Sequence, residues 1–219
     1  MDITFLDNSS FRFKGKAATV ILDPYESLNG KKFPKQTADI VTVSHDHEGH
    51  NASFSVDGDP IVLTGPGEYE IKGTKIVGVP SFHDEKGGKS HGKNTIFNTK
   101  IDGLSVCHLG SFGQSELTTN QMETIGNVDI LLIPTGGVDT MDAEAAAKII
   151  SELEPKIVIP MHYLEAVGQK KGDGQVQLEP VEKFLKEMGA EKVQPQDKLT
   201  ISKEKLPEEL QVVLLASKS

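Results

Sequence analysis

Three of the chain's seven histidines fall within six residues, directly after an apolar run that is typical of a β-strand. These are His45, His47 and His50. Imidazole is the commonest protein ligand for zinc and similar ions, and a loop that leaves a rigid strand can aim several rings at one point. The alternative is a polar, solvent-facing loop that happens to be rich in histidine. Because histidine is rare in the rest of the 219 residues, the clustering favours a metal site.

The composition is ordinary for a soluble globular protein, with 37% hydrophobic and 25% charged residues. No apolar run approaches the roughly 20 residues of a membrane-spanning helix, and the first residues lack the features of a signal peptide. We therefore expect a cytoplasmic protein that forms one domain over residues 1–219. The net charge of −9 argues against broad binding to nucleic-acid backbone. The single cysteine, Cys107, excludes an internal disulfide and is expected to be a small core residue.

The spacing of apolar residues predicts a strand-rich first half and a mixed second half. One helix is expected between Ala143 and Leu153, and a second should begin after Pro180 and end before Gly189. Gly168–Gln177 is expected to be a mobile loop. The expected strands are Ile3–Leu6, Phe11–Lys14, Ala17–Leu22, Ala38–Ser44, Ile61–Thr64, Glu68–Lys72, Lys75–Val79, Thr95–Ile101, Leu104–His108, Val128–Pro134 and Lys156–Met161.

Three further histidines follow, or end, strand-like runs: His83, His108 and His162. Residues at strand ends converge on one edge of a sheet, where loops form sites on a stiff scaffold. Each of these histidines alone would more often be structural. Taken together, five histidines make a metal site the better explanation. The candidate ligands are His45, His47, His50, His108 and His162.

Several short motifs follow one another in an order found in a known family. They are Thr42–Asn51, which matches His-x-His-x-Asp-His in part, Gly65–Glu70, Ser81–Asp84, Gly92–Phe97, His108–Gly110, Ile133–Gly137 and Ile159–Tyr163. In these motifs, from about residue 3 to residue 201, the chain resembles the metallo-β-lactamase-fold superfamily, in particular its small UlaG-like branch of zinc-dependent hydrolases. The resemblance implies an α+β fold, a four-layer αβ/βα sandwich with helices outside two mixed sheets and a metal cleft along one sheet edge.

The resemblance also implies a division of the histidines between two metals. His45, His47 and His108 match the ligands of the first metal, and His50 and His162 match ligands of the second. Three histidines and a water would form the open tetrahedral arrangement of catalytic zinc. We therefore expect one zinc ion at the first position, with the second position short of ligands.

Two acidic ligands of the family pattern are absent. Gly49 stands where the motif has an aspartate, and Ser111 stands where a metal-bridging aspartate usually follows His-Leu-Gly. Glycine has no side chain to coordinate a metal, and a neutral hydroxyl is a poor ligand. Because no general base accompanies Ser111 in the sequence, a lost ligand explains it better than a serine nucleophile does.

Other candidate positions are less specific. His83 and Asp84 could approach the metals or the substrate, and His91 lies in a loop with three lysines that could close on an anionic small molecule. The same loop could simply be flexible and solvated. Gly136 and Gly137 follow an apolar strand, where they would form either a tight turn or the cleft floor that the resemblance implies.

Two functions remain open on the sequence. The first is a metal-dependent hydrolase that acts on a small ester, lactone or phosphoester through a weakened or mononuclear site. The second is a non-catalytic relative that keeps the cleft for ligand binding or assembly. Retention of five histidines favours the first, and loss of both carboxylates favours the second.

Overall fold

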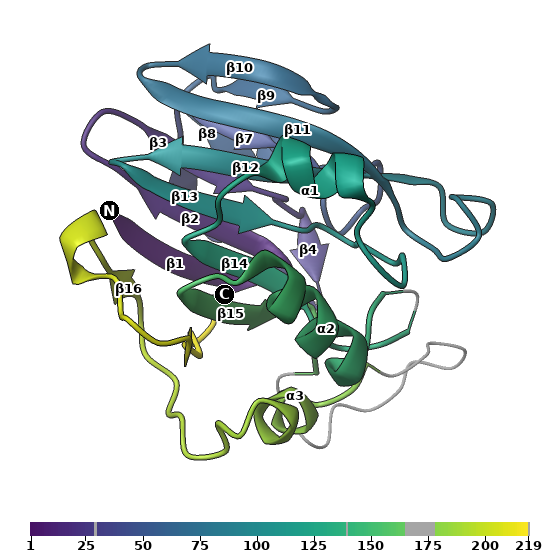
Figure 1. The fold of residues 1–219 in the computed structure, drawn as a ribbon. Coiled ribbons are helices and arrows are strands. Elements are labelled where there is room, and N and C mark those ends of the chain that lie inside the picture. The colour runs from purple at the N-terminus through teal and green to yellow at the C-terminus, as the bar shows by residue number, and fades with distance from the viewer. Residues whose placement is uncertain (29, 139, 165–177, 219) are drawn as a thin grey trace.

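Two β-sheets form the centre of the computed structural model, which describes residues 1–28, 30–138, 140–164 and 178–218 (Figure 1). The first sheet contains β1 (Asp2–Asp7), β2 (Ser10–Lys14), β3 (Thr19–Leu22), β7 (Ile40–Thr42), β9 (Ile61–Leu63) and β16 (Leu199–Thr200). The second contains β10 (Gly67–Ile71), β11 (Thr74–Phe82), β12 (Lys93–Ile101), β13 (Leu104–His108), β14 (Ile130–Pro134), β15 (Ile157–Met161) and β17 (Gln211–Val212). Their spatial orders are β16-β1-β2-β3-β7-β9 and β10-β11-β12-β13-β14-β15-β17.

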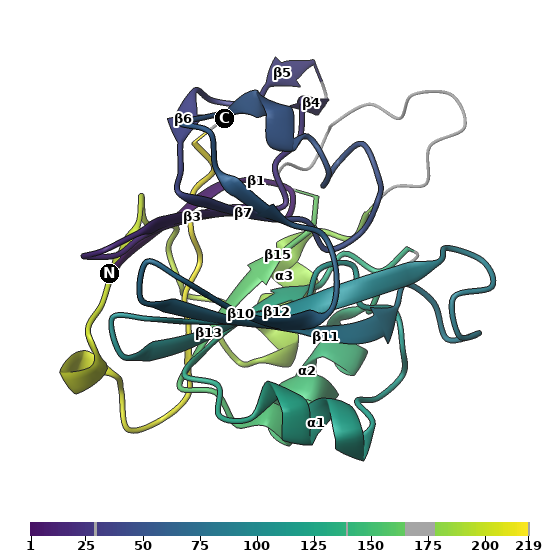
Figure 2. The ribbon, with the colours of Figure 1, turned by 90° about the horizontal axis from the view of Figure 1, so that it is seen from above.

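The main hydrophobic core fills the space between the two sheets, which lie face to face in Figure 2. Phe11 and Phe13 come from the first sheet, and Phe97 and Leu132 come from the second; all four are fully buried. Successive side chains of a strand point to opposite faces, so each sheet can supply this core and still cover its other face with apolar residues. The parallel strands β14 and β15 are buried along their whole length.

Three α-helices lie on the outer face of the second sheet: α1 (Thr119–Ile125), α2 (Ala143–Leu153) and α3 (Val181–Glu187) (Figure 2). Their apolar sides form a second core with the sheet. The outer face of the first sheet is covered differently, by Phe33, Ala38 and Val56. These residues lie in or near short elements, β4 (Ser27–Leu28), β5 (Lys31–Lys32), β6 (Gln36–Thr37), η1 (Ser53–Ser55) and β8 (Val56–Asp57).

The expected α+β sandwich is confirmed, and both expected helices are present. In the described residues the α-helices cover the second sheet, and the segment between β3 and β7, which contains Pro24 and Pro34, forms the short strands β4, β5 and β6. Gly168–Gln177, the expected mobile loop, lies outside the described residues. None of the helices described is long and apolar enough to cross a membrane.

Strand direction brings several loops to one edge of the sandwich. β3 and β7 are parallel and in register, with Leu22 beside Thr42, so the residues that follow them are neighbours. β13, β14 and β15 are also parallel, and β11 runs in the same direction because it is antiparallel to β12. The histidines expected at strand ends therefore gather at this edge.

Candidate metal centre

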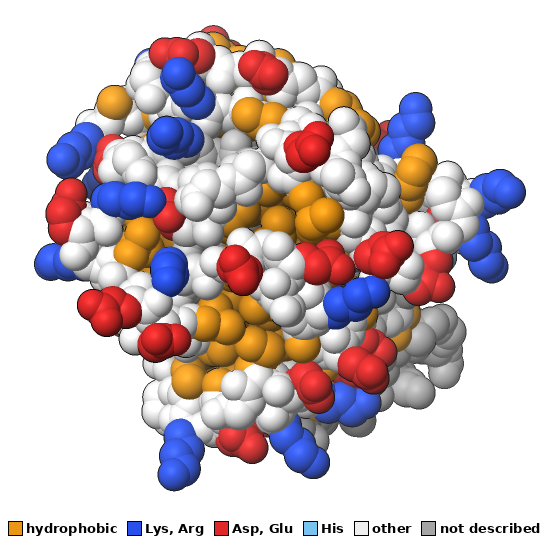
Figure 3. Space-filling model, viewed as in Figure 1, with side chains coloured by type: hydrophobic (Ala, Val, Ile, Leu, Met, Phe, Trp, Pro, Cys, Tyr) orange, Lys and Arg blue, Asp and Glu red, His pale blue; other side chains and the backbone are white. Residues whose placement is uncertain are grey.

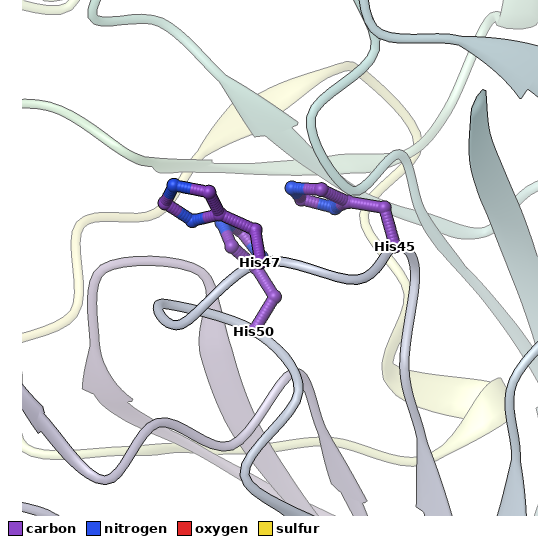
Figure 4. Close-up of side chains that lie close together, drawn as sticks. All are labelled: His45, His47 and His50. Atoms are coloured by element: carbon purple, nitrogen blue, oxygen red, sulfur yellow. The ribbon is translucent and has the colours of Figure 1, made fainter. Parts of the chain in front are cut away.

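His45, His47 and His50 lie together on the loop that follows β7. One ligand nitrogen from each lies within 4.8 Å of the others, and Figure 4 shows the three side chains close together. A tight turn produces this cluster, because the amides of His50 and Asn51 both donate to the carbonyl of His47, at 2.8 and 3.1 Å. Asp46 and Glu48 alternate with the histidines and are exposed.

A buried carboxylate, Asp23, orients the histidines of the cluster from its buried side. It follows β3 directly, and its Oδ2 accepts a 2.8 Å hydrogen bond from His50 Nδ1 and a 2.6 Å bond from Ser44 Oγ. Ser44 Oγ in turn accepts from His45 Nδ1 at 2.9 Å. These bonds assign the ring protons of His45 and His50 to Nδ1, which leaves both Nε2 lone pairs available.

The Nε2 atom of His45 shows that these residues fit a metal. It is buried and makes no hydrogen bond in the described part of the chain. Buried polar atoms in native proteins nearly always have a partner, so an unpaired lone pair beside two further imidazoles indicates a place for a cation.

Burial keeps the imidazoles of His45 and His162 in the neutral form that can bind a metal. Desolvation, followed by the charge of His50, lowers the pKa of His45 to about 3, and the same two causes lower the pKa of His162 to about 3. Burial alone would raise the pKa of Asp23, but the neighbouring His108 and the bond from His50 outweigh it and bring this pKa to about 2. At neutral pH His45 and His162 are therefore neutral and Asp23 is anionic.

These pKa values predict that acid destabilises the metal-free protein. His45 and His162 bind protons in the unfolded chain below about pH 6.5 but resist protonation in the folded chain down to about pH 3. Their contribution to stability is thus complete above about pH 6.5 and is lost as the pH falls from about 6.5 toward 3. Each proton adds a slope of up to about 1.4 kcal/mol per pH unit.

Urea unfolding in EDTA should show the free energy of unfolding falling from pH 7 to pH 5. A flat profile would contradict the assigned burial, and His162→Gln should make the slope shallower.

His108 stands apart from the cluster in this geometry. Its ring is fully buried, with Nε2 2.8 Å from the carbonyl oxygen of Ser9 and Nδ1 accepting a 3.2 Å bond from the amide of Gly110. Coordination through Nε2 would require the bond to Ser9 to be exchanged for a metal. The sequence could not show this competition, since Ser9 lies 99 residues away.

His162 flanks the cluster from the end of β15. Its ring centroid lies 6.1 Å from that of His50, and its buried Nδ1 makes no hydrogen bond within the described residues. The backbone is in the left-handed region, with φ of 51°, which a histidine adopts only at a cost. Gly136 lies against it so closely that a Cβ there would be 2.2 Å from the carbonyl oxygen of His162. Gly137 has a φ of 62° and forms the turn that follows.

The two positions that lack carboxylates are both buried. Ser111 Oγ lies 3.5 Å from His50 Nε2, so Ser111, His50 and Asp23 follow one another in space. That distance exceeds the roughly 2.6–3.2 Å of a serine nucleophile and its base, and Ser111 has no exposed surface. A Cβ at Gly49 would lie 3.3 Å from Asn8 Nδ2, which is tight but not blocked.

Nothing else among the described residues replaces the lost acids. The other buried carboxylates are those of Asp84 and Asp129. Asp84 is held by four backbone amides, from Lys86, Gly88, Ser90 and His91. Asp129 bonds to Lys203 Nζ at 2.6 and 2.8 Å. Neither carboxylate is free to bind a metal at the cluster.

The rings of His83 and His91 lie next to the cluster, between His45 and the protein surface. The ring centroid of His83 is 4.9 Å from that of His45, and the ring centroid of His91 is 5.4 Å from that of His83. His83 is half-buried and His91 is exposed. Both therefore lie at the rim of the site, where the sequence placed candidate substrate contacts.

Sequence reasoning missed Asp23 and Ser44, which orient two of the clustered histidines. The sequence did contain a signal, because an Asp-Pro pair directly after an apolar strand marks a turn in which the carboxylate accepts nearby donors. Its partner could not be identified without knowing that β3 and β7 are parallel neighbours.

Comparison with known proteins shows the family of this chain. The profile of the β-lactamase superfamily domain matches residues 2–162, a span that contains all the histidines discussed above. The chain therefore belongs to this superfamily.

Individual relatives agree with that assignment. A protein called UPF0173 metal-dependent hydrolase from Thermococcus onnurineus is 29% identical over 191 residues, which cover 74% of this chain and 84% of the relative. A crystal structure from Thermotoga maritima, described as a Zn-dependent hydrolase of the metallo-β-lactamase superfamily, is 33% identical with a TM-score of 0.78, and the match covers 98% and 97% of the two chains. An isothiocyanate hydrolase from Delia radicum gut bacteria has a TM-score of 0.68 at 15% identity, covering 92% of this chain and all of that one, which shows the shared fold alone.

Proposed function

We propose that this protein is a metal-dependent hydrolase of small molecules that works from one zinc ion held chiefly by His45, His47 and His50. The observation that carries the proposal is the ordered cluster: three ligand nitrogens within 4.8 Å, with the lone pair of His45 Nε2 buried and unpaired. The names of the relatives support the hydrolase assignment. His162, whose ring centroid is 6.1 Å from that of His50, is a further candidate ligand, and His108 joins the set if its bond to Ser9 is released.

The chemistry that such a site supports is hydrolysis of an ester, lactone or phosphoester. A zinc ion, when bound, would lower the pKa of a coordinated water to roughly 7 and polarise the bond under attack. The protein's part is to fix the imidazoles: Asp23 holds His50 directly and His45 through Ser44. Gly49 and Ser111 leave no carboxylate to accept a proton or bridge two ions, which favours a single metal.

Metal analysis with matched variants tests this proposal. Protein purified without added metal and then dialysed against zinc should hold about one ion per chain. His47→Ala should lose most of the ion and still fold, because His47 is exposed and its ring is not part of the core. Glu48→Ala, an exposed neighbour on the same loop, should keep it. If His47→Ala retains the parent's zinc content, the cluster is not the metal site.

Hydrolytic assays then separate the two functions that the sequence left open. Zinc-dependent turnover of esters, lactones or phosphoesters supports the enzyme, whereas bound zinc without turnover supports a ligand-binding relative. One domain over residues 1–219 and a cytoplasmic location stay predictions of the sequence.

A further inference from the structure

The loop between β11 and β12, residues 83–92, is rigidly built although it is exposed. The Asp84 carboxylate accepts four backbone N–H bonds of 2.7–3.0 Å, from Lys86, Gly88, Ser90 and His91. These bonds hold the pKa of Asp84 at about 2, with the bond from His91 the largest cause. The carboxylate therefore stays charged and stays in place, and the loop is not the flexible segment that its glycines suggest.

Close backbone contacts fix the same loop at its base. A Cβ at Gly88 would lie 2.8 Å from the carbonyl oxygen of Gly92, so the two arms can approach only because glycine is present. The amide of His83 donates to Gly92 O at 3.1 Å, and the amide of Gly113 donates to Phe82 O at 3.0 Å. Gly113 follows the end of β13 by a few residues, so the loop is anchored beside the metal centre.

This construction holds His91 at the rim of the site. The ring contacts from His91 to His83 and from His83 to His45 form a continuous row that runs from the exposed loop to the buried cluster. A substrate bound at the cluster would meet His83 and His91 on this side.

The loop is also basic in an otherwise acidic protein. Lys86 and Lys89 are exposed on it, and Lys93 is exposed at the start of β12 beside it. The exposed carboxylate of the loop is Glu85, since the Asp84 carboxylate is bonded to backbone amides. In Figure 3, Lys and Arg side chains gather on the projection at the right that this loop forms in Figure 1. The whole chain carries a net charge of −9, so the basic character is local.

The metal centre itself is short of anionic ligands on its substrate side. Gly49 and Ser111 supply no carboxylate, and Asp23 lies beneath the histidines. The exposed Asp46 and Glu48 are the acidic groups on the cluster's own loop. Neither position 49 nor position 111 therefore adds a carboxylate that would repel an oxyanion bound at the rim of the cluster.

We infer that residues 83–93 form a preorganised oxyanion-binding arm, that His91 is its substrate contact, and that the substrate is a small phosphoester in preference to a neutral ester or lactone. This inference rests on the proposed function and narrows its substrate class. Asp84 is a positioning residue, because it acts by shaping the loop that carries His91. A histidine on a rigid loop can donate to a phosphate oxygen at little entropic cost.

The binding test uses inorganic phosphate as the probe, with calorimetry on both zinc-loaded and metal-free protein. His91→Ala should weaken phosphate binding by about fivefold, the size expected of one partly exposed charge-assisted contact, with zinc content unchanged. His91→Arg should restore binding, and Asp84→Asn should weaken it because the loop loses its anchor. Lys75→Ala removes an exposed lysine from β11 outside the loop and should change nothing. Equal binding by parent and His91→Ala, or an equal loss in Lys75→Ala, would overturn the inference.

The catalytic test separates this inference from the proposed function. In zinc-loaded protein, His91→Ala should raise KM for a phosphomonoester and leave hydrolysis of a neutral ester unchanged. If His91→Ala raises KM equally for the phosphomonoester and the neutral ester, the arm does not select phosphoesters, but the protein is still a hydrolase. If the loaded protein hydrolyses nothing, the proposed function fails, and phosphate binding alone decides whether the arm binds oxyanions.

Discussion

Asp23→Ala should weaken zinc binding by about 10- to 100-fold and lower the free energy of unfolding by about 3–5 kcal/mol. The substitution removes the acceptor for His50 Nδ1, Ser44 Oγ and the amide of Ser44, all in a fully buried place. The rings of His45 and His50 would then lose the bonds that fix their Nε2 atoms toward the cluster. Zinc affinity by competition with a chelator and urea unfolding of the metal-free protein measure the two effects.

Asp129→Ala is the matched control for this prediction. Asp129 is also buried and also accepts backbone and side-chain bonds, from the amide of Ser105 and from Lys203. Its removal should destabilise the protein and leave the zinc affinity of the folded fraction unchanged. Asp23→Asn keeps the volume and one acceptor oxygen, so it should be destabilised less than Asp23→Ala and should lose less zinc affinity. If neither Asp23 variant binds zinc more weakly than the parent, Asp23 does not organise the site.

Gly49→Asp together with Ser111→Asp should raise bound metal from about one to about two ions per chain. The resemblance implies an aspartate at both positions, and a carboxylate between two cations is strongly favoured. The structure admits both changes: a side chain at Gly49 meets Asn8 Nδ2, which can donate to it, and Ser111 already faces His50. Hydrolysis of a small-substrate panel should rise by at least about tenfold, equivalent to about 1.4 kcal/mol of barrier.

The single variants test whether the two carboxylates act as a unit. Each alone should gain little metal, and Ser111→Asp alone should lower the stability of metal-free protein because it buries an unpaired charge. Elemental analysis and urea unfolding of the parent, the two single variants and the double variant form a double-mutant cycle that measures how far the two carboxylates act together. A double variant that folds but gains neither metal nor turnover would show that the cleft has diverged beyond its ligands, and the non-catalytic function would then be preferred.

The sequence predicted those features that depend on local spacing. The apolar positions from Ala143 to Leu153 gave the bounds of α2, and Pro180 marked the start of α3. The histidine cluster after β7 was visible because three ligands share one short loop. α1 was not predicted, although the local Thr118-x-x-Gln121 pattern is a capping-box signal, because the helix has only seven residues.

The features that escaped prediction depend on contacts distant in sequence. Asp23 meets Ser44 and His50 only through the parallel pairing of β3 with β7. The direction of the His108 ring is set by Ser9, on the turn between β1 and β2. The roles of individual ligands, which the family resemblance implied, stay predictions until metal is measured.

The pairing of β1 with β16 has a consequence for synthesis on the ribosome. Asp2 lies beside Thr200, Met1 N donates to Ile201 O at 3.0 Å, and the amide of Lys218 donates to Phe5 O at 3.1 Å. Contacts between residues about 200 positions apart close slowly, because the chain entropy of the loop is lost before they form. A nascent chain therefore exposes the open edge of β1, which can pair with other chains, until the residues of β16, near position 200, have left the ribosome.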